Sequence, residues 1–286
     1  MNNGLLVVNK PKGMTSRDVV NKVCRKFNTK SVGHIGTLDP LAEGVLVCLI
    51  GKYTKLANIL TNHDKEYIAS FKLGILTDTL DITGKVLKEC KKEFSKDEIT
   101  SALNHFKGKY NQEVPIYSAV KVNGKKLYEY ARNNIDVKLP SKIVNIYDIE
   151  FIDIKDDIIT IKCRVSKGTY IRSLIRDIGA FLDTYATMTS LVRTTLGNFN
   201  IDEAYTLEDI ENNNYKLLKL TDFLDVVTKK IDNEEDYKHI KNGNVMNINT
   251  NNYILFTYED EDIALYQQWQ KEKSEKNKAV RNWRTT

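Results

Sequence analysis

One segment of the chain places a carboxylate in a predicted loop with glycines on both sides of it. Asp39 lies in the sequence GHIGTLDPLAEGVL, residues 33–46, five residues after His34 and just before an apolar run. A carboxylate in such a loop can be exposed at its tip and held from below, which suits a nucleophile or a general base. On its own, Asp39 is equally typical of a turn or cap residue before Pro40.

Two further side chains could act beside such a carboxylate. Arg172 ends the segment SKGTYIR, in which a glycine allows close backbone approach and a predicted helix presents the arginine. A guanidinium beside a carboxylate favours its ionised form and fixes its orientation. Tyr67 lies in the alternating segment 65–73, which predicts a half-buried strand, and its ring could stack on a base or its hydroxyl could move a proton. A surface ion pair and a core position are the simpler interpretations of these two residues.

Basic and aromatic residues interleave around a tight turn predicted at Asn123-Gly124. Such a mixture suits phosphate contact and stacking on bases. Residues 10–30 and the tail after residue 270 are also rich in lysine and arginine, although the net charge is only +5. Solvated lysine-rich faces explain this charge equally well. The residues that we predict to contact RNA are Lys10, Tyr117, Lys121, Lys125, Arg132 and Lys167.

The composition excludes several classes of protein. With 286 residues, 41% of them hydrophobic, the chain can form one large domain, or one large and one small. We find no run of transmembrane length and no secretory leader, and therefore expect a cytoplasmic protein. The four cysteines form no C-x-x-C pair and the four histidines no ligand-like spacing, so we expect no metal site. No phosphate loop or dinucleotide fingerprint appears, and we expect no cofactor.

The predicted elements mix strands and helices without strict alternation, which indicates an α+β fold. Strands are predicted at 5–9, 45–50 and 65–73, and a hairpin at 142–165. Helices are predicted after Ser16 as the cap, after a capping box of Ser95 and Glu98, and at 169–182. Past residue 230 the composition turns rich in Asn and Asp and then strand-like at 253–258 and 263–266. We therefore expect a catalytic domain at 1–230 and a small C-terminal segment at 231–286.

Taken in order, five blocks of the sequence resemble the bacterial tRNA pseudouridine synthases of the TruB family, which modify uridine 55 in the T-arm of tRNA. They are LVVNKPKGMTS (6–16), GHIGTLDPLAEGVL (33–46), DKEY (64–67), the segment 117–132 and SKGTYIR (166–172). Five ordered blocks, which cover roughly residues 5–200, are far more specific than any one motif.

The resemblance implies a pseudouridine synthase fold, with a mixed, mainly antiparallel central sheet flanked by helices. It also implies a thumb-like insertion at about 117–140 and a β-rich, PUA-like C-terminal segment for RNA binding. Asp39 matches the family's catalytic aspartate, Tyr67 its active-site tyrosine and Arg172 the arginine paired with the aspartate. His34 matches a histidine that contacts the rearranged RNA loop, and Leu191 an apolar residue that lines the pocket. The expected activity is isomerisation of uridine 55 by base flipping, in a monomer that binds the T-arm stem-loop and uses neither metal nor cofactor.

Three alternatives stay open at this point. The chain could be an RNA chaperone that binds the T-arm without modifying it, or a guide-RNA-dependent relative of these enzymes. It could also be an unrelated carboxylate hydrolase such as a glycosidase, which needs two facing carboxylates. Asp78 and Asp81 are the nearest candidates for a second acid, but their turn-rich setting indicates loop caps.

Overall fold

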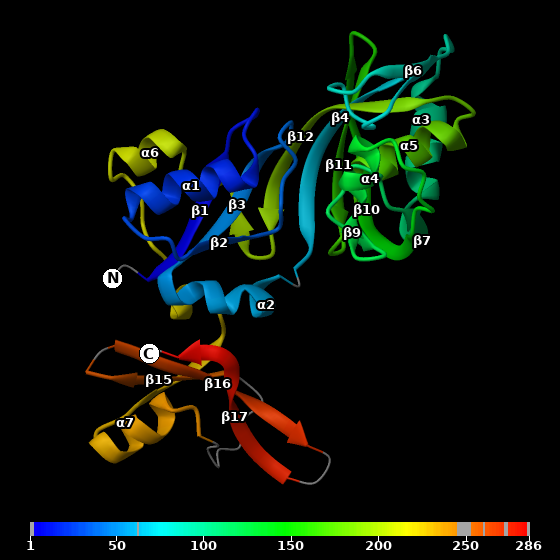
Figure 1. Ribbon diagram of the computed structural model, residues 1–286. Coiled ribbons are helices and arrows are strands. Elements are labelled where there is room, and N and C mark those ends of the chain that lie inside the picture. The colour runs from blue at the N-terminus through cyan, green and yellow to red at the C-terminus, as the bar shows by residue number, and fades with distance from the viewer. Residues whose placement is uncertain (1–2, 62, 245–252, 260, 272–273, 285–286) are drawn as a thin grey trace.

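The central element is a nine-stranded sheet. Its strands are β1 (Gly4–Lys10), β2 (Val32–Ile35), β3 (Glu43–Ile50), β4 (Lys65–Leu73), β7 (Gly108–Glu113), β10 (Ser141–Lys155), β11 (Ile158–Val165), β12 (Ala186–Leu196) and β13 (Phe199–Asn200). In the computed structural model, the order across the sheet is β1-β3-β12-β4-β11-β10-β7, with β2 beside β3 and β13 beside β12 (Figure 1). Among the described strands of this sheet, only β3 and β12 pair in parallel, so the predicted mixed, mainly antiparallel sheet is confirmed. The structure describes residues 3–61, 63–244, 253–259, 261–271 and 274–284, and no side chain after residue 267.

Strands β1 and β3 are buried on both faces, which explains why their sequences are continuously apolar rather than alternating. Leu6 and Val8 contribute to one core, and Leu5 and Val7 to another on the opposite face. Along β4 the pattern is closer to alternation: Tyr67, Ala69 and Phe71 are buried, as the sequence predicts.

The ends of the helices follow local sequence rules. The helices are α1 (Ser16–Lys26), α2 (Ala57–Leu60), α3 (Lys96–His105), α4 (Leu127–Arg132), α5 (Ile171–Phe181), α6 (Leu207–Glu211) and α7 (Glu234–Lys241), with 3₁₀ turns η1 (Gly51–Leu56), η2 (Ile201–Glu203) and η3 (Leu220–Asp222). Ser95 and Glu98 form the predicted capping box of α3. The predicted cap of α1 is wrong by one residue: Thr15 forms the box with Asp18, and Ser16 is the first helical residue. The hydroxyl of Ser16 instead contacts the backbone of Leu38.

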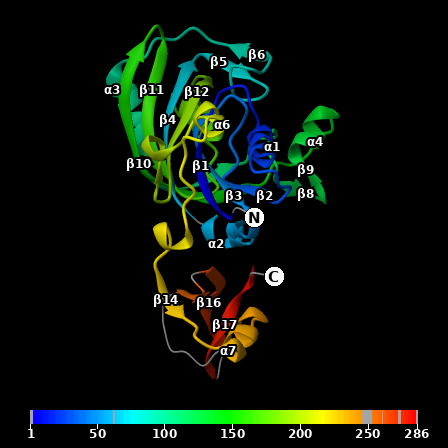
Figure 2. The same cartoon turned by 90° about the vertical axis from the view of Figure 1, so that its left-hand side faces the viewer.

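A thumb-like excursion separates β7 from β10. It holds a two-stranded hairpin, β8 (Lys121–Val122) and β9 (Lys125–Lys126), turned at Asn123-Gly124 as predicted, and then α4. A second small sheet, β5 (Ile75–Thr77) and β6 (Val86–Glu89), follows β4. In Figure 1, α1 and α4 lie on opposite sides of β12, and in Figure 2 both lie on the right of the sheet.

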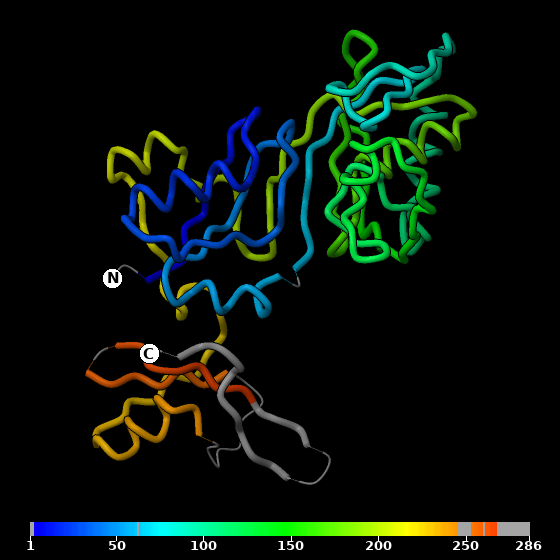
Figure 3. The backbone as a smooth tube through the Cα atoms, in the orientation of Figure 1, coloured from blue at the N-terminus to red at the C-terminus, as the bar shows by residue number. Residues whose placement is uncertain are grey.

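The C-terminal residues form a separate four-stranded sheet, in the order β14-β15-β16-β17. The tube in Figure 3 shows residues 226–244, 253–259 and 261–267 below the larger sheet. Its strands are β14 (Val226–Lys230), β15 (Tyr253–Tyr258), β16 (Glu261–Lys271) and β17 (Ser274–Arg284). Its first strand, β14, ends just before residue 231, where we expected the second domain to begin. The division into domains at 230/231 stays a prediction. Leu255 and Leu265 pack with Tyr53 in the core shared with the larger sheet. The basic side chains of the tail fall outside the described residues.

None of the helices in the described part of the chain has the length and apolar character needed to cross a lipid bilayer.

Candidate active site

The loop that carries Asp39 joins β2 to β3 and has a well-defined backbone. Gly36 and Gly44 adopt positive φ angles of +69° and +97°. A Cβ atom at Gly44 would lie 2.3 Å from the carbonyl oxygen of Arg193, so only glycine fits there. The carbonyl of Asp39 itself accepts a hydrogen bond from the N–H of Ala42 at 3.1 Å. The loop thus presents the Asp39 side chain from a fixed backbone.

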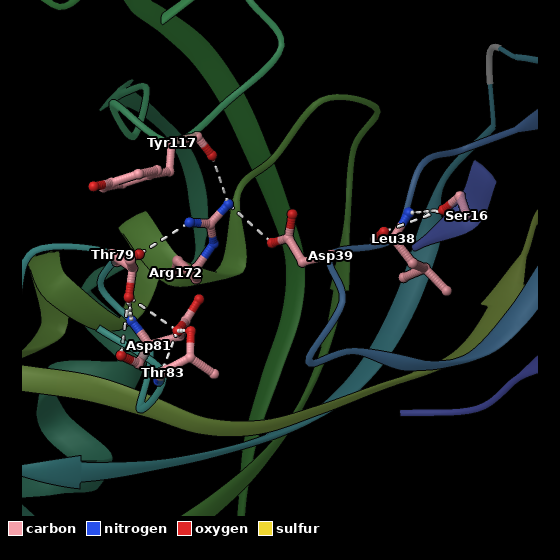
Figure 4. A network of polar contacts seen from close by, with 8 residues as sticks. All are labelled: Ser16, Leu38, Asp39, Thr79, Asp81, Thr83, Tyr117 and Arg172. Carbon is pink, nitrogen blue, oxygen red and sulfur yellow. Dashed lines mark hydrogen bonds and ion pairs between the residues drawn. The ribbon is translucent and has the colours of Figure 1, made fainter. Parts of the chain in front are cut away.

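The structure brings Asp39 and Arg172 together. Nη2 of Arg172 lies 2.9 Å from Oδ2 of Asp39 (Figure 4). The side chain of Arg172 is only 5% exposed, whereas that of Asp39 is 38% exposed. The guanidinium therefore holds the carboxylate from the protein side and leaves it accessible to a ligand.

Arg172 is itself held by two backbone carbonyls. Its Nη1 donates to the carbonyl of Thr79, and its Nη2 to the carbonyl of Tyr117, both at 2.9 Å. These contacts tie the first turn of α5 to the segment after β5 and to the start of the thumb (Figure 4). With its donors directed at fixed acceptors, the guanidinium has one orientation toward Asp39.

Asp78 and Asp81, the candidates for a second acid, are caps within one turn. Oδ1 of Asp81 accepts hydrogen bonds from Thr79 Oγ1 at 2.9 Å and from the N–H of Thr83 at 3.0 Å. Oδ1 of Asp78 accepts from the N–H of Lys85 at 2.8 Å. The prediction that Asp78 and Asp81 are loop caps is confirmed. Neither of them can serve as the second acid that a glycosidase needs. In the described residues, no group of three or more His, Cys, Asp or Glu could hold a metal ion.

Tyr67 and Leu191 lie on adjacent strands, β4 and β12, and each is 6% exposed. Arg193, which is fully buried, stands opposite Tyr67 in the register of these strands. Burial raises the pKa of the Tyr67 hydroxyl, and the Arg193 charge opposes that rise. The hydroxyl is thus neutral near pH 7. Arg193 is not among the predicted residues, although its spacing of two from Leu191 puts both on one face of a strand.

His34 lies on β2 and is partly buried. Burial lowers the pKa of its imidazole, and the charges of Arg17 and Arg193 lower it further. Its Nδ1 is buried and has no hydrogen-bond partner among the described residues. A neutral ring with an unsatisfied nitrogen suits contact with a nucleotide.

The prediction that Lys10 contacts RNA is wrong. Its side chain is fully buried inside the protein. Its Nζ donates to the carbonyl of Met14 at 2.6 Å and of Pro11 at 2.9 Å, and lies 3.5 Å from the carbonyl of Pro40. A basic residue among other basic residues looks like a surface residue in sequence, but here the ammonium joins two loops. We therefore assign Lys10 to the support of the Asp39 loop.

We expect the rate of a reaction that depends on Asp39 to fall as the pH rises past about 8. Burial lowers the pKa of Lys10 to about 8, although the charges of Glu43 and Asp39 raise it. Loss of the Lys10 proton weakens the hydrogen bonds from its Nζ to the backbone carbonyls and loosens the Asp39 loop. We therefore expect the rate to decrease about tenfold. Stability changes in the opposite direction. The folded-state pKa lies below the unfolded value of 10.5, so the unfolded chain binds more protons between the two and the free energy of unfolding rises with pH there.

The measurement compares wild type with Lys10→Gln, by single-turnover rate and by denaturant unfolding between about pH 7 and 10. The difference between the two proteins isolates Lys10 from Lys65, whose pKa burial also lowers to about 8. An alkaline decrease in rate that persists unchanged in Lys10→Gln would contradict this prediction.

The other predicted RNA contacts lie near the surface. Lys121, Lys125 and Arg132 are exposed on the thumb, and Lys167 is exposed just before α5. Tyr117 is half-buried, and its carbonyl rather than its ring contacts Arg172.

The basic face predicted at residues 10–30 is partly used within the protein. Lys22 pairs with the carboxylate of Glu211 at 3.6 Å, and Lys26 donates to the carbonyl of the same residue at 2.9 Å. These two lysines hold α6 against α1. Lys12 and Arg17 are exposed and remain available to an anionic partner.

Comparisons with known proteins agree with this arrangement. A model of the TruB family pseudouridylate synthase N-terminal domain matches residues 24–171, and a model of the tRNA pseudouridylate synthase B C-terminal domain matches residues 172–233. The chain is 41% identical over 270 residues to tRNA pseudouridine synthase B of Alkaliphilus oremlandii, covering 92% of this chain and 89% of that protein. It is 49% identical over 199 residues to tRNA pseudouridine synthase B of Fusobacterium nucleatum, covering 70% and 69% of the two chains.

Among solved structures, a Cbf5-Nop10-Gar1 complex contains a similar chain. The TM-score is 0.69 at 24% sequence identity, over 97% of this chain and 83% of the other. At this identity the likeness shows the fold alone. The fold, the two consecutive family matches and the identity to the bacterial enzymes agree with one another: the chain belongs to the TruB family and is a tRNA pseudouridine synthase.

Proposed function

We propose that this enzyme isomerises uridine 55 in the T-arm of tRNA, with Asp39 as the catalytic carboxylate. The observation that carries the proposal is the contact of 2.9 Å between Asp39 and Arg172, in which a buried guanidinium orients a partly exposed carboxylate. A carboxylate near RNA phosphates repels them, so a protein that only binds RNA gains nothing from one at this place.

The reaction breaks the N1–C1′ bond, turns the base and joins C5 to C1′. C5 loses a proton and N1 gains one, so atoms and electrons balance without a co-reactant. Asp39 acts at C1′, at C6 or on a ribose proton, and each of these roles requires the ionised form. Leu191 and Tyr67 line the place of the base, and His34 contacts the rearranged loop of the RNA.

The target base is inaccessible in a folded T-loop and must be flipped into the site. Unstacking costs a few kcal/mol, which phosphate contacts and restacking on protein groups offset. Lys121, Lys125 and Arg132 on the thumb, with Lys167 near the site, supply the phosphate contacts. The protein acts as a cytoplasmic monomer, with residues 1–230 as the catalytic domain and 231–286 as an accessory RNA-binding segment.

The test incubates the purified chain with tRNA transcript and maps pseudouridine by position. We expect modification at position 55, in the isolated T-arm stem-loop as well, and none in a transcript with cytidine at that position. No guide RNA is added, which separates this enzyme from a guide-dependent relative. RNA binding without any product would leave the chaperone alternative and refute the proposal.

We expect Tyr67→Phe to bind tRNA normally but to release the C5 proton slowly. The hydroxyl is neutral at rest and Arg193 lies beside it, so Arg193 lowers the cost of a transient tyrosinate that accepts this proton. In RNA with deuterium at C5, the variant should show a larger isotope effect than wild type and accumulate a rearranged, still protonated base. Full activity of Tyr67→Phe would restrict Tyr67 to packing.

A further inference from the structure

We propose that Ser16 is a positioning residue for Asp39: its hydroxyl holds the backbone of the residue that precedes the carboxylate. The inference rests on the proposed function, because it takes Asp39 as the group that acts on uridine.

The contact is a two-point clamp. Ser16 Oγ donates to the carbonyl of Leu38 at 3.1 Å and accepts from the N–H of Leu38 at 2.9 Å (Figure 4). Both residues are 3% exposed. Leu38 lies in the loop between two strands, where no ladder partner satisfies its backbone groups, and a buried unpaired N–H or C=O is costly. The hydroxyl therefore fixes the peptide units next to Asp39.

The same hydroxyl has no part in capping the helix on which it lies. Thr15 Oγ1 accepts from the N–H of Asp18 at 3.1 Å, and Oδ2 of Asp18 accepts from the N–H of Thr15 at 2.9 Å. At the first helical position an alanine would serve α1 as well as a serine. The sequence therefore carries two adjacent hydroxyls with different tasks, one for the helix and one for the loop.

Other ties hold the loop on both sides of this clamp. Arg193 Nη2 donates to the carbonyl of Gly36, and the N–H of Gly13 donates to the carbonyl of Pro40 at 2.8 Å. Ser16 acts between them, on the residue directly before Asp39. Without it, the carboxylate keeps its ion pair with Arg172, but the residue directly before Asp39 loses both of its hydrogen bonds to Ser16.

We expect Ser16→Ala to lower the single-turnover rate by about 10- to 100-fold, since a misplacement of about 1 Å costs a reaction on the order of 100-fold. The Kd for tRNA should stay within about twofold of wild type, because Ser16 is buried and touches no phosphate. Ser16→Thr keeps Oγ and should restore most of the rate. If Ser16→Ala does not fold, Ser16→Cys replaces it, since a thiol of similar shape is a weak donor and acceptor.

Thr15→Ala is the matched control. It removes the neighbouring hydroxyl and the helix cap, so it lowers the melting temperature, but it leaves the contact with Leu38 intact. Its rate should stay within about twofold of wild type, as for a change that affects stability alone. All variants are measured with saturating enzyme at a temperature where melting curves show them folded.

Equal rates for Ser16→Ala and Thr15→Ala would overturn the inference, and so would a loss confined to Kd. Asp39→Asn is assayed in parallel to separate the two proposals. If it is active, the proposed function fails; if it is inactive while Ser16→Ala matches the control, only the positioning role of Ser16 fails.

Discussion

Asp39→Asn is expected to abolish pseudouridine formation, with a rate at least about 10⁴-fold below wild type, as for other enzymes that lose a catalytic group. The amide keeps the shape of the carboxylate but has no charge, so it can act neither as a nucleophile nor as a base. The substitution also leaves Arg172 without its anionic partner at 2.9 Å. The measurement is pseudouridine formed in tRNA at saturating enzyme over a single turnover.

Asp177→Asn provides a matched control. Asp177 forms a similar pair with an arginine, 2.8 Å from Nη2 of Arg176, but outside the Asp39 site. This variant should retain the wild-type rate, and Asp39→Asn should bind tRNA as well as wild type or better, because a carboxylate repels phosphates. Pro40 lacks a backbone N–H, so the usual succinimide route cannot convert the new amide back to a carboxylate. A rate above about 1% of wild type in Asp39→Asn would contradict a catalytic role.

Features with a local cause could be predicted from the sequence. The capping box at Ser95 and Glu98 and the turn at Asn123-Gly124 each depend on residues a few positions apart. Alternation along residues 65–73 predicts which side of β4 is buried, because successive side chains point to opposite faces. Such patterns locate the elements but do not show which elements lie beside one another.

The supports of the Asp39 loop could not be predicted, since their partners are backbone groups far along the chain. Ser16 binds Leu38, 22 residues away, and Arg193 binds Gly36, 157 residues away. A side chain's type identifies it as a donor or an acceptor, but its partner is decided by the tertiary fold. Lys10 shows the consequence: its charge indicated a surface contact, yet its ammonium is buried against carbonyls.

The pairing of Asp39 with Arg172 lies between these cases. Neither local segment predicts the other, and the resemblance of five ordered blocks was needed to propose the contact. Its physical basis is the sheet, because β12, which follows α5, pairs in parallel with β3, which follows the Asp39 loop. The pairing of Asp39 with Arg172 therefore depends on the order of the strands in the sheet. The resemblance to the family predicts the pairing because it implies that order.

Arg172→Met is expected to reduce the rate by about 100- to 1,000-fold, the usual effect of removing one preorganised charged or donor group from an active site. The side chain is 5% exposed and joins Asp39 to the carbonyls of Thr79 and Tyr117. Its loss leaves these carbonyls without the donor, so the free energy of unfolding should also fall by about 1–3 kcal/mol. Arg172→Lys keeps the charge but lacks the planar fork, and we expect it to recover only part of the rate.

Arg176→Met separates this catalytic effect from a general effect of losing an arginine on α5. Arg176 lies one turn further along the helix and pairs with Glu113 at 3.0 Å and with Asp177 at 2.8 Å, neither of which contacts Asp39. Its free energy of unfolding should fall by less than that of Arg172→Met, because partly exposed ion pairs contribute little to stability. Its single-turnover rate should stay within about twofold of wild type, because Arg176 does not hold Asp39. Rates and unfolding curves for both variants decide the matter. Equal rates in Arg172→Met and Arg176→Met would mean that the guanidinium beside Asp39 serves the fold and not the reaction.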